Sequence, residues 1–489
     1  MIGLRIFWAL FLAGMVGWTF HRAWRWEHGE PLPEYMSAGD EPRTKETFVL
    51  IDAIFLPWVL LILLIMFLVI DGLNGVERFL SLSLDVMIVI SIHFLLLLFL
   101  LPFFRKHFSA RACATMWILP VFLFWQIHIL FDNVLAPVFV IYIPSNIRDI
   151  LFLVWGIGFV VVFAGRIISH AIFRHKVMVA SYPVHDAEVL QLFEQELKQL
   201  EYYHPVQLVI SPAATAPLSM GTTKRNRVTV LPKREFSRRE LQFIFRHEIH
   251  HLQRGDVGTK IFFAFCQSLC WFNPLMWIAT RKASDDLELS CDEIVLEDMD
   301  EGMRKQYAEL LLDTAGQAGG FTTCLSAAAE TMRYRLKHIV TVRKRQTGTL
   351  LLSVAMFLCV MSYGVVAVST DRGTVAELMT GDSTAADVIG VFYRSEDSED
   401  FSEILDWDRD GLFSYLTSLE AERFSSANEY YSYSGQGLSV EIKHDKHLID
   451  VTIYDRMIQV YRFGSDFKRE FFYLRSDVDW EQVESYLNA

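Results

Sequence analysis

Cysteine is scarce in this sequence, and none of its six cysteines lies after residue 370. Disulfide bonds therefore do not hold the C-terminal region together. Basic residues are also few there, with roughly 25 acidic against roughly 11 basic residues from residue 371 onward. A basic surface of the kind that binds nucleic acid is absent from this region, so no direct nucleic-acid partner is expected.

Long apolar runs dominate the first 170 residues. Each run is near the ~20 residues that a helix needs to cross a bilayer, which predicts an integral membrane protein. The first run lacks a small-x-small cleavage site, so it is interpreted as a span rather than a removable signal. The six runs are Ile2–Phe20, Phe48–Ile70, Leu84–Phe104, Ala112–Phe131, Ile150–Ile168 and Thr349–Val368.

Positive charge in the short loops predicts how these spans are oriented. The loop from Arg105 to Arg111 is basic, and so is the segment after the fifth run, which holds Arg174 and Lys176. Because basic loops stay in the cytosol, this topology places the segment after the fifth run inside and both chain ends outside. The predicted parts are a five-span region 1–170, a cytosolic domain 171–348, a sixth transmembrane helix 349–369 and an extracytoplasmic α+β sensor domain 370–489.

The segment 171–348 has the pattern of a mixed α and β domain. Apolar residues keep helical spacing from Val189 to Leu200, and the sequences VQLVI and RVTVLP are typical of short strands. Ser237 and Glu240 form a capping box, which predicts that the next helix begins at this point.

That helix carries the sequence HEIHH at residues 247–251, which predicts a metal site. His247 and His251 are four apart, so both point from one helix face and can bind one metal ion. Glu248 stands beside the first histidine, placed to take a proton from metal-bound water. Zinc lowers the pKa of that water to about 7 and polarises the substrate carbonyl. The same pattern also occurs on exposed helices that bind nothing, so a further ligand is needed to decide.

A catalytic zinc ion needs a third protein ligand and an open fourth position. Glu288, in the sequence ELSCDEIVL, is the candidate, and Asp292 follows one turn later on the same helix face. Asp292 is predicted to hold a zinc-bound histidine through its free ring N–H, and Asp256 is given the same role. The alternative for Glu288 and Asp292 is a charged helix surface, which the preceding HEIHH disfavours.

The apolar segment 261–280 tests this site, because a span there would put Glu288 and His247 on opposite sides of the membrane. Asn273 and Pro274 interrupt the segment. Proline disfavours helical geometry at the preceding residue and removes a backbone donor. We therefore predict a broken hairpin that lies against the membrane without crossing it.

The C-terminal region has the character of a small α+β domain. Four strand-like runs, LSVEIKH, LIDVTIY, RMIQVYRF and EFFYLR, are joined by short polar turns. The runs DGLFSYLTSLEAERF and DWEQVESYL look helical.

Several motifs occur in an order and spacing that resembles a known family. HEIHHLQRGD, CWFNPLMW and ELSCDE follow one another, with VTVLP upstream and MRYRLKHI downstream. Over about residues 150–350 the chain resembles the BlaR/MecR family of bacterial membrane metallopeptidases, which is similar in fold to HtpX-type proteases. The resemblance implies a zincin-like (gluzincin) domain in the bacterial plasma membrane, with zinc ligands His247, His251 and Glu288 and the catalytic residue Glu248.

The C-terminal region departs from the best-known members of this family, which carry an external penicillin-binding domain with Ser-x-x-Lys, Ser-x-Asn and Lys-Thr-Gly motifs. Ser465-x-x-Lys468 occurs here in a strand-rich stretch, but no Lys-Thr-Gly follows it. The match at Ser465 is therefore interpreted as chance. We expect a sensor domain of another kind and no β-lactam sensing.

The predicted function is transmembrane signalling, in which the protease cleaves itself or a cytosolic regulator, such as a transcriptional repressor. An HtpX-like housekeeping protease and a non-catalytic receptor are the alternatives. Intact HEIHH and Glu288 argue against the receptor, and the external domain favours signalling over housekeeping. Besides the lipid bilayer, the expected partner is a protein or peptide that pairs with the strand holding Val228, Thr229 and Val230. A homodimer is left open.

Overall fold

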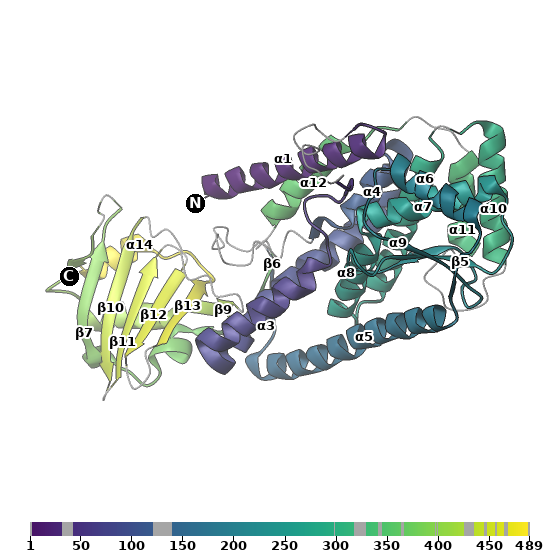
Figure 1. The fold of residues 1–489 in the computed structure, drawn as a ribbon. Helices are drawn as coiled ribbons and strands as arrows, with labels where there is room; N and C mark the ends of the chain where they lie inside the picture. The colour runs from purple at the N-terminus through teal and green to yellow at the C-terminus, as the bar shows by residue number, and fades with distance from the viewer. Residues whose placement is uncertain are drawn as a thin grey trace.

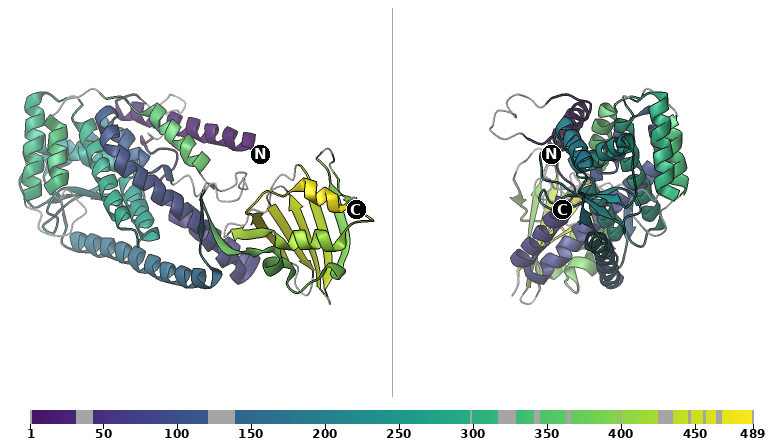
Figure 2. Two further views of the ribbon diagram at one scale, coloured as in Figure 1. Left: turned by 180° about the vertical axis from the view of Figure 1, so that it is seen from behind. Right: turned by 45° about the vertical axis from the view of Figure 1, so that its right-hand side comes forward.

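The computed structural model shows three connected parts of the chain (Figure 1). Long apolar helices join a helical domain with a small sheet to a β-sheet domain at the C-terminal end. In Figure 2 the β-sheet domain stands apart from the helical domain, with long helices reaching from one to the other. The structure describes residues 2–31, 43–120, 139–297, 299–316, 329–340, 345–362, 366–396, 398, 400–424, 435–444, 447–454, 457–463 and 468–487.

Five helices lie in or next to the predicted apolar runs. The first and the last of them lie side by side in both figures. Arg5 connects these two helices, because its Nη2 donates hydrogen bonds to the carbonyl oxygens of Val360 at 3.1 Å and Met361 at 3.0 Å. The helices are α1 (Ile2–Glu27), α3 (Phe55–His107), α4 (Ala110–Met116), α5 (Ser145–Val179) and α12 (Thr349–Ser362).

Helix α3 is continuous over two runs that were predicted to be separate spans. Its 53 residues include most of Phe48–Ile70 and all of Leu84–Phe104. The intervening residues hold no proline, and Gly72 and Gly75 alone do not end a helix among good helix formers. At about 1.5 Å per residue, α3 is about 80 Å long, against about 30 Å of hydrocarbon in a bilayer.

Two helices of the described ranges are long and apolar enough to cross a membrane, Met87–His107 and Ile150–Val179. The most apolar window of the second has no buried residue, unlike a core helix of a soluble protein. Trp58–Val69 and Thr349–Ser362 are shorter apolar helices. The fourth predicted run, Ala112–Phe131, continues outside the described residues, and the six-span topology stays a prediction.

The domain that carries HEIHH combines helices with a four-stranded sheet of order β2-β3-β5-β4. Both predicted strands are present, as β3 and β5. Its apolar core includes Phe193, Phe245, Ile249 and Leu311. The elements are β2 (Tyr182–Pro183), α6 (Ala187–Gln199), β3 (Gln207–Ser211), β4 (Leu218–Met220), β5 (Val228–Pro232), α7 (Arg238–Arg254), α8 (Asp256–Leu269), α9 (Pro274–Val295), α10 (Glu301–Gly316) and α11 (Ala329–Val340).

Helix α7 begins and ends where local sequence requires. The side chain of Ser237 accepts the N–H of Glu240, and the side chain of Glu240 accepts that of Ser237, so the predicted capping box is confirmed. Gly255 follows the helix with φ of 68°, a left-handed conformation that favours glycine and ends the helix.

The predicted break of segment 261–280 is also confirmed. Helix α8 ends at Leu269, and α9 begins at Pro274, with the Asn273 side chain accepting the N–H of Leu275. The two helices pack against each other, and α9 packs against α7. Glu288 on α9 therefore lies next to α7, the helix that carries the two histidines.

Strand β5 contradicts its predicted role as the substrate-binding strand. Val228, Thr229 and Val230 pair with β3 on one side and with β4 on the other. Both edges are thus already hydrogen-bonded, and no peptide can add to this strand. The prediction failed because β4 lies within a turn-rich sequence, SPAATAPLSMG, in which a three-residue strand leaves no periodic pattern.

The C-terminal domain is a nine-stranded sheet with helices α13 (Arg409–Ser418) and α14 (Trp480–Leu487) packed on it. The four predicted strands are present as β10 to β13, each antiparallel to the next. The helix predicted over DGLFSYLTSLEAERF ends early, because its last residues pair into strand β9. In sheet order the strands are β1 (Phe139–Tyr142), β6 (Val366–Thr374), β9 (Glu420–Phe424), β13 (Lys468–Leu474), β12 (Met457–Phe463), β11 (His447–Tyr454), β10 (Gly437–His444), β7 (Val388–Arg394) and β8 (Ser402–Glu403).

Strand β1 of this sheet belongs to the region 1–170, which was predicted to span the membrane. It pairs in parallel with β6, so that Ile141 is opposite Val368, and the N–H of Ile143 donates to Ser369 at 2.8 Å. Helix α5 begins only three residues after β1. The C-terminal domain is therefore joined to α5 as well as to α12.

Candidate metal centre

Helices α7 and α9 bring the three predicted metal ligands together. The Nε2 atoms of His247 and His251 lie 3.1 Å apart. Oε2 of Glu288 lies 3.5 Å from the first of these nitrogens and 3.6 Å from the second. Two donors bound to one tetrahedral zinc ion at about 2.0–2.2 Å would be about 3.3–3.6 Å apart. Two sides of the triangle of donor atoms fall in this range and the side of 3.1 Å is slightly shorter, so the three atoms are close enough to bind one metal ion.

A buried network holds the far side of the His247 ring. Its Nδ1 lies 3.1 Å from the Tyr307 hydroxyl and 3.4 Å from Asp292 Oδ1. Tyr307 donates to Asp292 at 2.6 Å, and Arg335 donates two hydrogen bonds of 2.7 Å to the same carboxylate. Burial alone would raise the pKa of Asp292, but the Arg335 guanidinium outweighs burial and lowers that pKa. An ionised Asp292 thus lies where it can orient the ring.

The ring of His251 has its own acidic partner. Nδ1 of His251 lies 2.7 Å from Asp256 Oδ2 and 3.4 Å from the thiol of Cys291. Burial alone would raise the pKa of Asp256, but the hydrogen bond with His251 and the charges of His251, Arg254 and Arg111 together outweigh burial and lower that pKa. The structure thus places both acids that were predicted as second partners, Asp256 and Asp292, against the far sides of the two histidine rings.

Glu288 has a partner that the sequence pattern did not indicate. Its Oε1 accepts a hydrogen bond of 3.0 Å from Lys260 Nζ on α8. Burial alone would raise the pKa of Glu288, but the charges of Lys260 and His251 outweigh burial and lower that pKa well below its usual range. The carboxylate is therefore ionised, as a metal ligand must be.

Glu248 lies beside the ligands, at a small hollow. The hollow is lined by Glu248, His247 and Tyr307 together with apolar side chains of Pro217, Ile244, Leu310 and Leu311. The hydroxyl of Ser219 on β4 lies 3.5 Å from the backbone oxygen of Glu248, within donating distance. The outer strand of the small sheet therefore lies against the part of α7 that carries the metal ligands.

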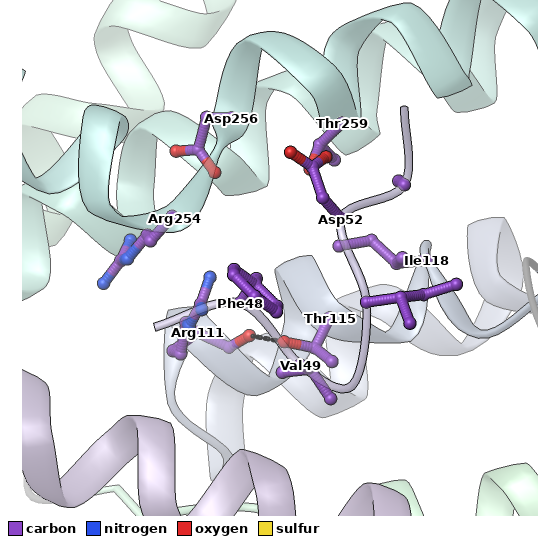
Figure 3. A pocket seen from close by; sticks show the side chains of 11 residues that line it. Phe48, Val49, Asp52, Arg111, Thr115, Ile118, Arg254, Asp256 and Thr259 are labelled. Atoms are coloured by element: carbon purple, nitrogen blue, oxygen red, sulfur yellow. Dashed lines mark hydrogen bonds between the residues drawn. The ribbon is translucent and has the colours of Figure 1, made fainter. Parts of the chain in front are cut away.

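A small pocket with charged and apolar lining lies between the end of α7, the start of α8 and helix α4 (Figure 3). Asp256 and Arg254 line it together with Asp52 and with Arg111 of α4. Arg254, the last residue of α7, donates from Nε and Nη2 to the two carboxylate oxygens of Glu27, each at 2.8 Å. Because Glu27 ends α1, this buried ion pair ties the first apolar helix to the metal helix.

Sequence reasoning missed Lys260, Tyr307, Arg335 and the pair of Arg254 with Glu27. Tyr307 and Arg335 were detectable in principle, because each interrupts an otherwise apolar face of its helix. The neighbours on these faces are the buried residues Leu310, Leu311, Met332 and Ile339. Lys260 and the pair of Arg254 with Glu27 could not be detected from the sequence around them, because only tertiary packing brings their partners near.

The arrangement places this domain among the HExxH metallopeptidases, whose general base is a glutamate that follows the first ligand. Comparison with protein families leads to the same class, since residues 133–339 match the family described as BlaR1 peptidase M56. These residues are thus similar to the BlaR1 M56 metallopeptidases, and they contain the candidate metal site.

Two regulatory proteins show a partial similarity. The regulatory protein BlaR1 of Bacillus licheniformis is 28% identical over 210 residues, which cover 42% of this chain and 34% of that protein. The methicillin resistance mecR1 protein of Staphylococcus aureus is 24% identical over 172 residues, which cover 34% of this chain and 28% of that protein. The matched part thus spans about a third of the length of these relatives.

Proposed function

We propose that this chain is a zinc endopeptidase of the bacterial plasma membrane that passes an external signal to a protein substrate in the cytosol. The observation that carries the proposal is the triangle of His247, His251 and Glu288, with Glu248 beside it. The metallopeptidase domain is proposed to face the cytosol, and the C-terminal sheet to face the outside. The two candidate spans support a location in the membrane.

In this proposal, zinc supplies Lewis acidity toward water and the substrate carbonyl. Glu248 takes the proton of the attacking water molecule and transfers it to the nitrogen of the leaving amine. Asp256 accepts the N–H of the His251 ring, and the Tyr307 hydroxyl, which donates to Asp292, accepts that of the His247 ring, which leaves each Nε2 to the metal.

The substrate is proposed to pair with the outer edge of β4. In the part of the chain that the structure describes, β4 pairs with β5 alone, so its other edge can accept a strand. Ser219 connects this strand to the backbone of Glu248, and the apolar side chains that line the hollow beside Glu248 favour an apolar side chain of the substrate as their contact. The expected cleavage site is therefore next to a large apolar residue.

A physical connection from the C-terminal sheet supports the signalling role over a housekeeping role. The sheet is joined through β1 to helix α5. Trp155 of α5 donates to the carbonyl oxygen of Leu269 at 2.7 Å, and Trp271 donates to the carbonyl oxygen of Trp155 at 3.2 Å. These contacts lie at the break between α8 and α9, the helices that carry Asp256 and Glu288. A ligand that shifts the sheet could thus bias two states of the site.

The peptidase proposal is tested with Glu248→Gln in the purified full-length protein. The variant should keep one equivalent of zinc and lose about 10²–10⁴-fold of its cleavage of apolar fluorogenic peptides. Glu309→Gln, at an exposed position of α10, is the control and should cleave normally. A wild-type protein without zinc, or normal cleavage by Glu248→Gln, would contradict the proposal.

The signalling proposal is tested by deleting residues 372–489 and following self-cleavage in cells with and without envelope stress. The truncated protein should lose its response to stress. If cleavage responds as in the full chain, the C-terminal domain is not the sensor, and the housekeeping protease becomes the better explanation.

A further inference from the structure

The two carboxylate oxygens of Glu288 have different neighbours. Oε2 lies 3.5 Å and 3.6 Å from the Nε2 atoms of the two histidines. Oε1 is held by Lys260 at 3.0 Å. The side chains of Lys260 and Glu288 are 31% and 14% exposed, so much of this ion pair is shielded from water.

Helix α8 supports two of the three ligands from one face. Asp256 and Lys260 are four residues apart, so their side chains project from the same side of the helix. Asp256 contacts the second histidine, and Lys260 contacts the glutamate. Gly258, between them, permits a close approach of Asp52, because a Cβ atom there would lie 2.5 Å from Asp52 Oδ1. This packing limits rotation of α8 and so holds both supports in place.

We propose that Lys260 is a positioning residue that makes Glu288 bind zinc through Oε2 alone. The inference rests on the proposed zinc site. A carboxylate can give a metal one oxygen or two, and the second oxygen would fill the open position that a catalytic zinc needs for water. The charge-assisted hydrogen bond from Lys260 keeps Oε1 away from that position.

The positive charge of Lys260 indicates whether its loss would change the affinity for zinc or the coordination of zinc. An ammonium group close to a divalent cation repels that cation, and this repulsion offsets the help that Lys260 gives in keeping Glu288 ionised, so its charge adds little net metal affinity. Its loss should therefore leave zinc in place and change how zinc is coordinated. Activity should fall through kcat, because the position for water is then occupied by Oε1.

The test compares Lys260→Met with Lys305→Met, a control at an exposed lysine of α10. Each full-length variant is purified, its zinc content is measured, and zinc is replaced by cobalt(II) for visible absorption spectra. Lys260→Met should retain one metal ion, show the weaker absorption of five-coordinate cobalt, and lose about 10–100-fold in kcat with little change in KM. Lys260→Arg, which can still donate to Oε1, should restore a four-coordinate spectrum.

Two results would overturn the inference. A cobalt spectrum of Lys260→Met that superimposes on that of the wild type would show that Oε1 does not turn to the metal. Loss of the metal from Lys260→Met would show that Lys260 holds the site together instead of selecting its coordination. If Lys260→Met does not fold, Lys260→Gln replaces it with the same criteria. A wild-type protein that binds no metal would refute the zinc site itself, which is a separate outcome.

Discussion

The buried pair of Glu27 and Arg254 provides a quantitative test of how the first apolar helix is connected to the metal helix. The side chain of Glu27 is 0% exposed and that of Arg254 is 1% exposed, and two hydrogen bonds of 2.8 Å join them. Arg111 lies 3.4 Å from the same carboxylate. The substitution Glu27→Gln removes the negative charge, keeps the shape of the side chain and leaves two buried arginines without it.

The expected loss of stability follows from the burial and from the pKa. Breaking a buried ion pair on one side typically costs about 3–5 kcal/mol, because a charge is left uncompensated. Burial alone would raise the pKa of Glu27, but Arg111 and Arg254 outweigh burial and lower it from 4.5 to about 2. At about 1.4 kcal/mol per pH unit, this depression corresponds to about 3 kcal/mol. The loss of stability expected from the uncompensated buried charge and the loss expected from the pKa therefore have similar magnitudes.

The sign of the pH dependence is also determined. A carboxyl group whose pKa is depressed on folding contributes its full stabilisation above its unfolded pKa, and loses it as the pH falls toward the folded value. The stability gap between wild type and Glu27→Gln should therefore be largest at neutral pH. It should narrow between about pH 4.5 and pH 2.

The assay is denaturant unfolding of the full-length protein in detergent, at neutral and acidic pH. Glu30→Gln is the matched control, because Glu30 pairs with Arg25 at the surface and should cost less than about 1 kcal/mol. A Glu27→Gln variant that is within about 1 kcal/mol of wild type at neutral pH would refute the reasoning. So would a gap that does not depend on pH.

Three further substitutions test local features. Ser237→Ala should destabilise the start of α7 by about 1 kcal/mol through loss of the capping box, seen as faster hydrogen exchange in its first turn. Tyr307→Phe removes the hydroxyl beside the first histidine and should weaken zinc binding or activity about 10–100-fold, measured by chelator competition and peptide cleavage. Gly258→Ala should cost about 1 kcal/mol in unfolding free energy, because its Cβ would displace the Asp52 carboxylate from its hydrogen bond with the Ile54 N–H. Gly14→Ala, where a Cβ meets nothing within 4 Å, should cost nothing. Unchanged behaviour in any of the three would contradict the contact that it removes.

The sequence by itself determined the features that depend on neighbours along the chain. His247 and His251 share a helix face because they are four residues apart, and the capping box of α7 needs only Ser237 and Glu240. The break before α9 follows from Pro274, which cannot continue a helix through its own nitrogen. These features are local, so short-range pattern and stereochemistry were sufficient to predict them.

Tertiary structure alone decided the features that depend on distant partners. The pairing of β5 on both edges required β4, and strand β9 formed in a helical pattern because β6 and β13 pair with it. The contact of Lys260 with Glu288 and that of Glu27 with Arg254 join residues from different helices. Each buried charge needs a partner of opposite sign, and the sequence shows the charge without showing which helix supplies the partner. Packing of the helices determined that choice, and with it the orientation of the metal ligands.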